Sequence, residues 1–353
     1  MIKRRKTRVI NVGPVSIGGD NPVVVQSMTK TDTKDVSATV RQIEALAGSG
    51  CRIVRVAVKD KEAASALGAI VRRSAVPIIA DIHFDWRLAL VSMDAGAAGI
   101  RINPGNIGGE KRLGEIVEQA RRQSIAIRIG VNSGSLEKDL LKKYGAPVPA
   151  ALVESAMRSI RLCEGWGFTN IKLSLKSAHV MDTIAAYRSI SQATDYPLHV
   201  GVTEAGTVLR GAIKSSVGIG ILLSEGIGDT IRVSLAGDPL TEVMCGYTIL
   251  SSLGLAKRGV EVIVCPTCGR TEMDIVSMAQ QIETRLSGYD LPITVAVMGC
   301  EVNGPGEARE ADIGICGGKK YGLLFKKGKI VRKLKEAEMV EALMDEIDKM
   351  TRT

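Results

Sequence analysis

Short apolar runs and longer amphipathic stretches alternate in a regular order along the first 255 residues of the chain. Eight runs have the length of a β-strand and are apolar almost throughout, which predicts strands that are buried on both faces. These runs are Val23–Gln26, Ile53–Ala57, Pro77–Ala80, Gly99–Ile102, Ala126–Ile129, Ile171–Ser174, Leu198–Val202 and Thr230–Ser234. The stretches between them have helical periodicity; Val36, Val40 and Ile43, for example, share one face of a helix. Eight strand–helix units predict an α/β fold, a closed TIM-type (β/α)8 barrel.

The segment before the first of these strands predicts a β-hairpin that runs into it. Residues 8–25 alternate around a turn at residues 18–21, with the apolar residues Ile10, Val12, Val15 and Ile17 before that turn. A doubly wound open sheet is the alternative to a barrel, but such sheets usually have a glycine fingerprint after the first strand. The loop Ser27–Asp32 has no such fingerprint, and the chain has no Walker A motif.

The pattern changes after Ser252, and Ala256–Gly259 predicts a linker. We therefore expect two domains, residues 1–255 and residues 256–353. The second should contain strand Val260–Val264, helix Met273–Leu286, strand Ile293–Val297, strands near Ile313–Cys316 and Tyr321–Lys326, and helix Glu336–Met350. These elements predict a smaller α+β domain. Its basic segment, residues 319–335, is expected to be the solvated face of a hairpin.

Composition narrows the class of protein. Aromatic residues make up only 3% of the chain, which argues against a surface that stacks RNA bases. The net charge of +9 suits an acidic partner or a phosphorylated substrate, and it is spread along the chain rather than gathered as in nucleic-acid binders. No apolar run approaches the ~20 residues of a membrane span, and the basic N-terminus lacks the apolar core of a signal peptide. We expect a cytoplasmic protein that binds neither nucleic acid nor membrane.

Three cysteines predict a metal centre in the second domain. Cys265 and Cys268 form a C-x-x-C turn, and Cys300 follows a predicted strand and precedes the turn-rich segment Asn303–Gly306. Thiolates are soft ligands that suit an iron–sulfur cluster or zinc. The spacing leaves both open, with Cys316 as the fourth thiolate of a zinc site. A disulfide is a third option, but nothing else in the chain indicates secretion.

Polar residues stand on the predicted barrel strands or just beyond their carboxyl ends, where barrels of this type build their active sites. They are Arg55, Asp81, His83, Arg101, Asn103, Arg128, Asn132, Lys172, Ser174, Lys176, His199, Thr203, Glu204, Arg232 and Ser234. Six of them are Arg or Lys, and only Asp81 and Glu204 are acidic. Burying so many cations without counter-anions costs several kcal/mol each. The set therefore predicts a multiply anionic ligand, and both side-chain types suit phosphate oxygens.

The motifs Cys265-x-x-Cys268, Met298-Gly299-Cys300 and Asn303-Gly304-Pro305-Gly306-Glu307 resemble the signature of the 4-hydroxy-3-methylbut-2-en-1-yl diphosphate synthase family. These are iron–sulfur enzymes of the methylerythritol phosphate route to isoprenoids. The resemblance covers nearly the whole chain and implies the two-domain form. It also implies a [4Fe–4S] cluster held by Cys265, Cys268, Cys300 and Glu307. By spacing alone, Glu301, Glu310 or Asp312 could serve as well as Glu307.

The same resemblance implies that the barrel binds a cyclic diphosphate. Substrate contact is expected for Arg55, Asp81, His83, Arg101, Asn103, Arg128, Asn132, Lys172, Ser174, Lys176, Thr203, Glu204, Arg232 and Ser234; His199 is expected to be structural. The implied reaction is the reductive ring opening of 2-C-methyl-D-erythritol 2,4-cyclodiphosphate with two electrons from flavodoxin or ferredoxin. It also implies a homodimer in which the cluster domain of one chain completes the barrel site of the other. We hypothesise that Glu204 assists proton transfer or holds a hydroxyl.

Overall fold

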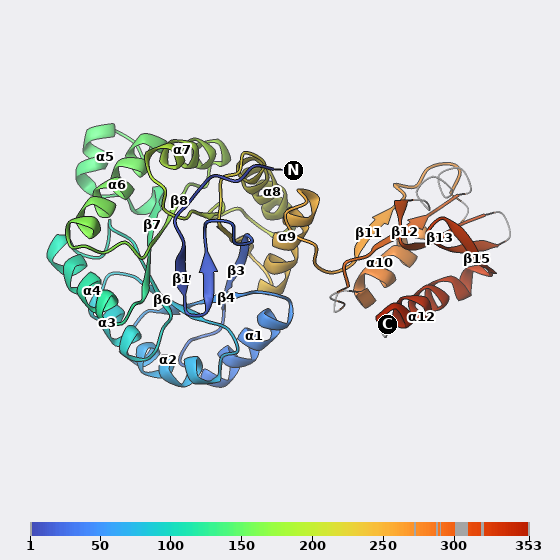
Figure 1. Cartoon of the computed structure of the whole chain (residues 1–353), viewed down its shortest axis with the longest axis horizontal. Helices are drawn as coiled ribbons and strands as arrows, with labels where there is room; N and C mark the ends of the chain where they lie inside the picture. The colour runs from blue at the N-terminus through green and yellow to red at the C-terminus, as the bar shows by residue number, and fades with distance from the viewer. Residues whose placement is uncertain are drawn as a thin grey trace. The chain divides into compact units, whose positions relative to one another are not determined.

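The computed structural model describes residues 2–271, 273–286, 289, 291–300, 310–318 and 321–351. The chain forms two compact units, Met1–Ala256 and Lys257–Thr353, each with its own hydrophobic core (Figure 1). Glu301, Asn303 and Glu307 of the predicted cluster motif lie outside the described residues.

Eight parallel strands of the first unit form a closed barrel. They are β3 (Val24–Met28), β4 (Ile53–Val58), β5 (Ile78–Ile82), β6 (Gly99–Ile102), β7 (Ala126–Asn132), β8 (Ile171–Lys176), β9 (His199–Val200) and β10 (Thr230–Ile231). Neighbours pair in the order β8-β7-β6-β5-β4-β3-β10-β9. A parallel bridge between Leu173 and Leu198 joins β8 to β9 and closes the circle. The predicted (β/α)8 barrel is confirmed, although the last two strands are shorter than predicted.

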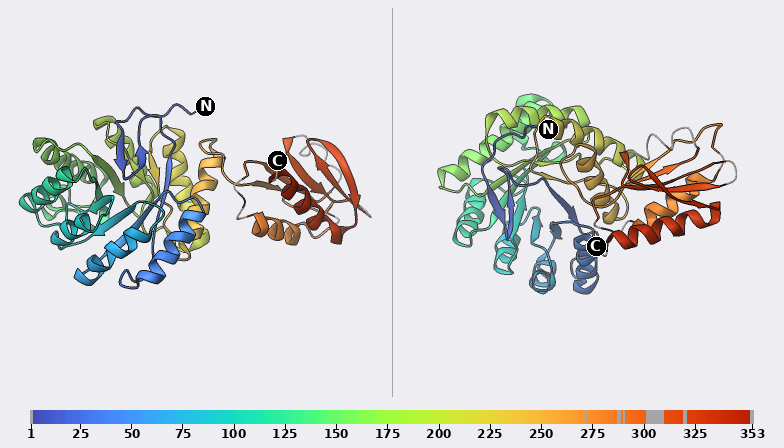
Figure 2. Two further views of the ribbon diagram at one scale, coloured as in Figure 1. Left: turned by 60° about the horizontal axis from the view of Figure 1, so that its bottom comes forward. Right: turned by 45° about the vertical axis from the view of Figure 1, so that its right-hand side comes forward.

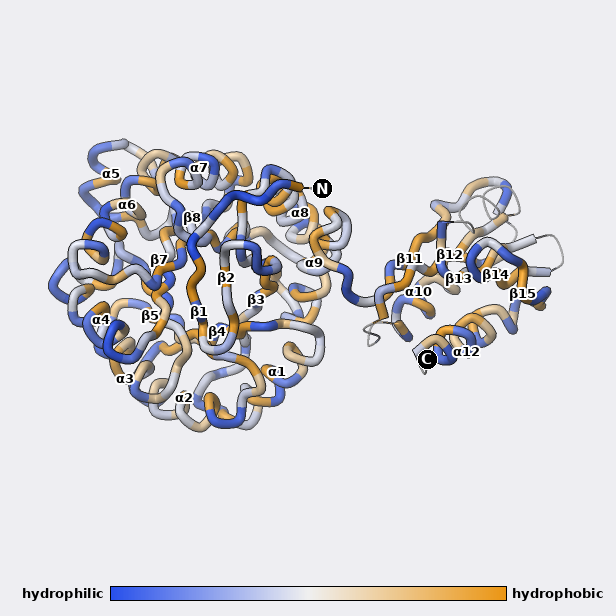
Figure 3. Tube along the Cα trace, viewed as in Figure 1, coloured by the Kyte–Doolittle hydropathy of each residue, from blue (hydrophilic) through white to orange (hydrophobic). Residues whose placement is uncertain are grey.

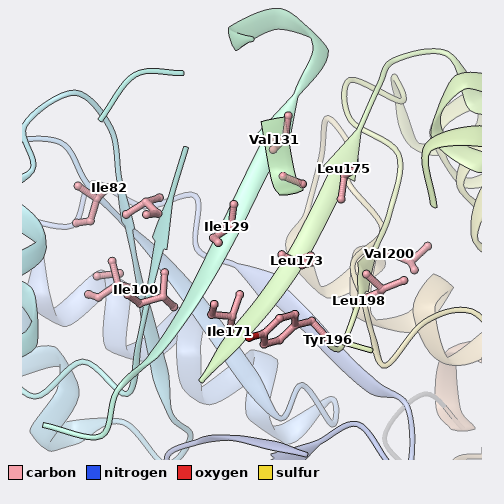
Figure 4. Packing of buried hydrophobic residues seen from close by; sticks show 14 of the residues in the cluster. Ile82, Ile100, Ile129, Val131, Ile171, Leu173, Leu175, Tyr196, Leu198 and Val200 are labelled. Carbon is pink, nitrogen blue, oxygen red and sulfur yellow. The ribbon is translucent and has the colours of Figure 1, made fainter. Parts of the chain in front are cut away.

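Helices surround the barrel and cover the outer faces of its strands. They are α1 (Val36–Gly48), α2 (Lys61–Arg73), α3 (Arg87–Asp94), α4 (Glu110–Arg122), α5 (Lys138–Tyr144), α6 (Pro149–Gly165), α7 (Val180–Ala193), α8 (Val208–Ser224) and α9 (Pro239–Ser252), with the 3-10 turn η1 (Ser133–Ser135). Alternate strand residues such as Ile129, Val131 and Leu173 are buried in the core between strands and helices (Figure 4). Each side chain of this size contributes about 1.5–3 kcal/mol when fully buried.

An N-terminal hairpin closes the amino end of the barrel. Its strands are β1 (Ile10–Val12) and β2 (Val15–Ile17), and Figure 3 colours the trace by the hydropathy of each residue. Their apolar side chains pack against the first residues of several barrel strands, among them Ile53 and Ala126. Figure 2 shows the hairpin beside the barrel strands. The hairpin turn lies at Gly13, whose φ of +55° favours glycine, and not at residues 18–21 as predicted. Residues 18–21 turn the chain from the hairpin into β3, so the sequence contains two turn signals of similar strength.

Among its described residues, the second unit contains a five-stranded mixed sheet with the helices α10 and α12, which confirms the predicted α+β class. Its elements are β11 (Glu261–Val264), α10 (Ile275–Leu286), β12 (Thr294–Met298), β13 (Ile313–Cys316), β14 (Gly322–Lys326), β15 (Lys329–Leu334), the 3-10 turn η2 (Glu336–Glu338) and α12 (Met339–Thr351). The strands follow the order β11-β12-β13-β14-β15; the first three are parallel, and β14 and β15 form an antiparallel hairpin.

The two faces of this sheet carry different residues. Val295, Val297 and Ile315 pack with side chains of α10 and α12. The alternate strand residues Ala296 and Met298 pack on the opposite face, in a second cluster that contains Cys265 and Cys316. The cysteines therefore lie on the face of the sheet that is opposite to α10 and α12.

Candidate active site

The upper interior of the barrel is polar, whereas barrels of this type usually fill it with branched apolar side chains. Inward residues alternate with the apolar residues that face the helices. The structure places Arg55 on β4, Asp81 on β5, Arg101 on β6, Arg128 and Asn132 on β7, and Lys172, Ser174 and Lys176 on β8; His83, Asn103, Thr203, Glu204, Arg232 and Ser234 lie beyond the carboxyl ends of β5, β6, β9 and β10. In register, Asp81 is paired with Arg101, Arg101 with Arg128, and Arg128 with Lys172. Four charged residues therefore form one row across four strands.

Asp81 is the counter-ion of two guanidinium groups, that of Arg101 in this row and that of Arg55 on β4. Its carboxylate lies 3.2 Å from Arg101 Nη1, 3.7 Å from Arg55 Nε and 3.4 Å from His83 Nε2. His83 Nε2 is also 2.8 Å from Arg101 Nη1. Burial alone would raise the pKa of Asp81, but Arg55, the hydrogen bond from His83, and Arg101 together lower it well below its ordinary value. Asp81 is therefore ionised over the physiological pH range and fixes the orientation of the guanidinium groups.

Other cations of the barrel have no partner among the described residues. Arg128 is 3% exposed and its Nε and Nη1 atoms lack a hydrogen-bond acceptor, as does Lys172 Nζ. Burial lowers the pKa of Arg128, Lys172 and Lys176 well below the ordinary values, and neighbouring cations, Arg128 among them for the two lysines, lower it further. An anion bound among these side chains would supply the missing acceptors and favour their charged forms.

Two glycines make room for the cations. A Cβ atom at Gly130 would lie 2.6 Å from Arg101 Nε, and one at Gly201 would lie 2.7 Å from Lys176 Nζ and 2.4 Å from a backbone oxygen. Arg101 and Lys176 therefore occupy space that any other residue at these positions would take. Both glycines belong to strands or strand ends, where the lack of a side chain is otherwise unfavourable.

We expect the change Gly130→Ala to weaken the binding of inorganic pyrophosphate about tenfold or more, because the added methyl group must displace Arg101 and overpacking costs about 1–3 kcal/mol. Isothermal titration calorimetry measures this affinity. Gly134→Ala is the matched control, because a Cβ at Gly134 meets nothing within 4 Å. Equal affinities for the two variants would contradict the role assigned to Gly130.

Two asparagines near the mouth form hydrogen bonds with neighbouring groups. Asn103 is buried; its Oδ1 accepts a hydrogen bond from the Gly105 N–H at 3.0 Å, and its Nδ2 donates to Ser135 Oγ. Asn132, in its favourable amide orientation, accepts from Arg101 Nη2 at 3.2 Å. Glu204 is exposed beyond β9 and has a φ of +51°, a strained conformation for a residue other than glycine. His199 is fully buried with Nδ1 2.8 Å from Thr230 Oγ1, and its Nε2 atom has no hydrogen-bond partner among the described residues. Its structural role stays a prediction.

Sequence reasoning missed a third acidic residue, Glu242 on α9, which is 1% exposed. Its carboxylate lies 3.3 Å from Arg232 Nη2 and 3.1 Å from Lys30 Nζ. It also accepts hydrogen bonds from Ser27 Oγ at 3.0 Å and from the Leu235 N–H at 3.1 Å. The expectation that only Asp81 and Glu204 could balance the cations is therefore wrong. An acidic residue is common in the first turn of a helix, where it interacts favourably with the helix dipole, so nothing local in the sequence indicates this pairing.

The second unit places three cysteines at the carboxyl ends of adjacent parallel strands. Cys265 directly follows β11, and its N–H donates to the Val297 oxygen at 3.0 Å. Cys300 lies two residues beyond β12, and Cys316 is the last residue of β13; all three are buried. Cys268 is exposed, and its turn is held by Thr271, which accepts from the Cys268 N–H at 3.0 Å and donates its own N–H to the Cys268 oxygen at 2.9 Å.

The segments that carry Cys268 and Cys300 lie close together. A Cβ at Gly299 would lie 3.0 Å from Thr271 Cγ2, so glycine lets the Cys268 turn approach the end of β12. Within the described ranges, no three ligand-type side chains lie close enough to hold a metal. Asp312, one of the alternative ligands, accepts from the Thr294 N–H at 2.9 Å. That contact holds the Asp312 carboxylate at the amino end of β12, whereas Cys300 lies beyond the carboxyl end of the same strand. Glu310 is exposed, and Glu301 and Glu307 are outside the described residues.

The barrel contains buried cations without partners among the described residues, and the second sheet has cysteines at its strand ends. Together these features define the class of protein: a barrel suited to a multiply anionic ligand, with an appended domain that is rich in thiolates. Residues 7–247 match the family model described as GcpE TIM-barrel domain, and residues 261–349 match the GcpE protein C-terminal domain. The chain belongs to the GcpE family. The resemblance inferred from the motifs is thereby confirmed.

Curated relatives share this similarity over their full lengths. The chain is 56% identical over 347 residues to the 4-hydroxy-3-methylbut-2-en-1-yl diphosphate synthase (flavodoxin) of Geobacter sulfurreducens, with 98% of each chain covered. It is 57% identical over 353 residues to the protein of the same name from Caldanaerobacter subterraneus subsp. tengcongensis, which covers 100% of this chain and 99% of that relative.

Solved structures add support for the fold alone. Dihydropteroate synthase of Yersinia pestis superposes with a TM-score of 0.50 at 14% identity, over 70% of this chain and 99% of that chain. The similarity is that of a shared barrel. In the part of the chain that the structure describes, no helix is both long and apolar enough to cross a membrane.

Proposed function

We propose that the chain is an oxidoreductase that converts 2-C-methyl-D-erythritol 2,4-cyclodiphosphate into 4-hydroxy-3-methylbut-2-en-1-yl diphosphate, with uptake of two electrons and release of water, in isoprenoid biosynthesis. The observation that carries the proposal is the identity of 56% over 98% of the chain with a relative named for this product. The barrel fits such a substrate, because Arg128 and Lys172 present buried donors that lack an acceptor.

The barrel residues would bind the cyclic diphosphate and orient it. Arg55, Arg101, Arg128, Lys172, Lys176 and Arg232 supply the positive charge, and Asp81, His83, Asn103, Asn132, Ser174, Thr203, Glu204 and Ser234 complete the proposed contact set. Opening of the ring breaks a C–O bond and leaves negative charge on a phosphate oxygen. Preorganised cations stabilise that charge more in the transition state than in the substrate. Glu204, at the mouth of the barrel, would assist proton transfer or hold a substrate hydroxyl.

The second unit would hold a [4Fe–4S] cluster through Cys265, Cys268, Cys300 and Glu307. The chemistry of the donor set suits this group, because thiolates are the usual ligands of such clusters, and Cys265 and Cys300 lie at the ends of adjacent strands. When bound, the cluster supplies electrons one at a time and an iron with a displaceable ligand. The curated relatives are named for flavodoxin, and we propose a donor of that type, with ferredoxin as the other candidate. We also propose a homodimer that pairs each barrel with the partner's cluster domain; the mass in solution checks the dimer.

Metal and sulfide assays on anaerobically purified protein test the proposal. We expect about four irons and four sulfides per chain, with a brown colour that reductant bleaches. The variant Cys300→Ser should lose the iron and the turnover of the cyclic diphosphate. Stoichiometric zinc in a colourless protein would overturn the redox function and would favour Cys316 as the fourth ligand.

A further inference from the structure

The edge strand β15 and its hairpin partner β14 form a strongly basic surface in the second unit. Residues 321–335 contain no Asp or Glu, and their cations are Lys326, Lys327, Lys329, Arg332, Lys333 and Lys335. Residues 329–333 are all exposed. Ile330, with 67% of its surface exposed, and the exposed Val331 and Tyr321 lie among these cations. We call Tyr321, Lys329, Ile330, Arg332 and Lys333 the β15 surface; these residues stand on both faces of the edge strand, Arg332 on the face that carries the helices and Lys333 on the opposite face.

The positive charge of this surface is largely uncompensated. Lys326 lies 3.8 Å from Glu346, and Lys335 is followed by Glu336 and Glu338. Within the described ranges, Lys329 and Lys333 have no carboxylate partner. The Lys333 ammonium lies 4.3 Å above the ring of Tyr321, a contact that leaves its charge exposed. A concentration of one sign of charge attracts a partner of the opposite sign.

One end of the β15 surface lies in register with Cys316. Lys333 pairs with Leu323, Leu323 with Cys316, and Cys316 with Met298. Leu323, Cys316 and Met298 pack in the same cluster as Cys265, on the sheet face opposite to the helices. Two strand spacings separate Lys333 from Cys316, about 10 Å between backbones. Lys329 lies at the other end of the strand, about 13 Å from Lys333 along β15.

Lysines on an edge strand also have a simpler role, since they prevent edge-to-edge aggregation. That role requires charge alone. It does not account for Ile330, Val331 and Tyr321, which are exposed among the cations. Apolar and aromatic groups surrounded by charge are typical of protein–protein interfaces, in which the centre is apolar and the rim is polar.

We infer that the β15 surface is the docking site for the electron-donor protein, and that this donor presents an acidic surface. The inference rests on the proposed function, because it requires a cluster that accepts electrons in this unit. Each encounter oxidises the donor by one electron and reduces the cluster by one electron. Two encounters supply the two electrons that ring opening consumes. Docking at the Lys333 end places the donor close to the row of residues that leads to the cysteines.

The charge reversal Lys333→Glu tests the docking site. With a reduced flavodoxin as donor at low salt, we expect turnover of the cyclic diphosphate at limiting donor to fall about tenfold or more. With reduced methyl viologen as donor, we expect the variant to match the unaltered chain, because a small donor needs no docking surface. In about 1 M salt the two proteins should converge with either donor, since screening then acts within about 3 Å.

Two variants with the same change in charge are the controls. Lys329→Glu lies on the same strand but at the end remote from the cysteines, and its effect should be clearly smaller. Lys111→Glu on α4 of the first unit should have no effect on either donor. Equal losses in all three variants would show a general charge effect and would overturn the assignment of the β15 surface.

Turnover with methyl viologen separates a wrong docking site from a wrong proposed function. No turnover by the unaltered chain with methyl viologen would refute the function itself. Turnover with methyl viologen, together with unchanged flavodoxin-driven turnover in Lys333→Glu, would refute only the docking site. Binding of single-stranded RNA that Lys333→Glu abolishes, without a loss of flavodoxin-driven turnover, would assign the surface to nucleic acid and overturn the inference.

Discussion

Replacing Arg128 by methionine is expected to lower turnover about a thousandfold and to raise the stability of the ligand-free protein. Arg128 is 3% exposed, and two of its nitrogens lack acceptors among the described residues. Burial holds its pKa well below the ordinary value, and Arg55 and Arg101 lower it further. The guanidinium therefore destabilises the empty barrel. Replacing buried charge by apolar groups of similar volume is stabilising by about 1–4 kcal/mol in favourable cases.

The loss of activity has the same origin. Removal of one preorganised donor from a site of developing negative charge costs about 10²–10³ in rate, and Arg128 offers more than one donor. Kinetics and thermal unfolding of the same preparation measure both effects. Arg188→Met is the matched control, because Arg188 is half-exposed and paired with Glu225 at 2.9 Å. That variant should keep its turnover and lose at most about 1 kcal/mol. An Arg128→Met protein less stable than the unaltered chain would contradict the interpretation of Arg128 as an unsatisfied cation.

Truncation of Glu242 is expected to have the largest effect on stability. Glu242→Ala leaves Arg232 without its carboxylate and also removes the acceptor of Ser27 Oγ and of the Leu235 N–H. Breaking a buried ion pair by removing one partner costs about 3–5 kcal/mol, because the other charge stays buried. Denaturant unfolding measures this loss as a lower midpoint at constant slope.

Two further variants test this interpretation, one at Glu242 itself and one at a carboxylate on the surface. Glu242→Gln keeps an acceptor and should be destabilised less than Glu242→Ala. Glu154→Ala removes a carboxylate that also has three partners, Lys143, Tyr144 and Arg158, but on the surface. Solvent replaces those partners, so the variant should unfold close to the unaltered chain. Similar midpoints for Glu242→Ala and Glu154→Ala would refute the assignment of Glu242 as a buried counter-ion.

The barrel was predictable because its signal is repeated and local. Each strand shows an apolar run and each helix shows its own period. An error at one end of an element therefore does not alter the predicted fold class. The hairpin turn was misplaced because Gly13 and residues 18–21 both satisfy local turn rules, and only the packing against Ile53 and Ala126 selects between them. The pairing of Glu242 with Ser27 joins positions 215 apart in sequence, a contact that no local pattern reports.

The residues of the candidate site also fall into those that the sequence predicts and those that it does not. The cations could be identified by position, because they interrupt strands that are otherwise apolar. The counter-ion Asp81 could be identified in the same way, but Glu242 could not, since its carboxylate reaches Arg232 from helix α9. The cluster ligands were assigned by family motif, and Glu307 lies outside the described residues, so its role stays a prediction. The binding roles of the barrel residues are likewise predictions that the proposed experiments test.

The hairpin of β1 and β2 closes one end of the barrel, so the barrel is open only at the carboxyl ends of its strands. Ile10, Val12, Val15 and Ile17 seal the end that lies away from the charged row. A molecule that enters through the mouth must therefore leave by the same route. In the proposed function, the product must therefore leave before the next substrate enters. The diphosphate product would compete directly with the next cyclic diphosphate, and its rate of release would set an upper limit on the rate of turnover.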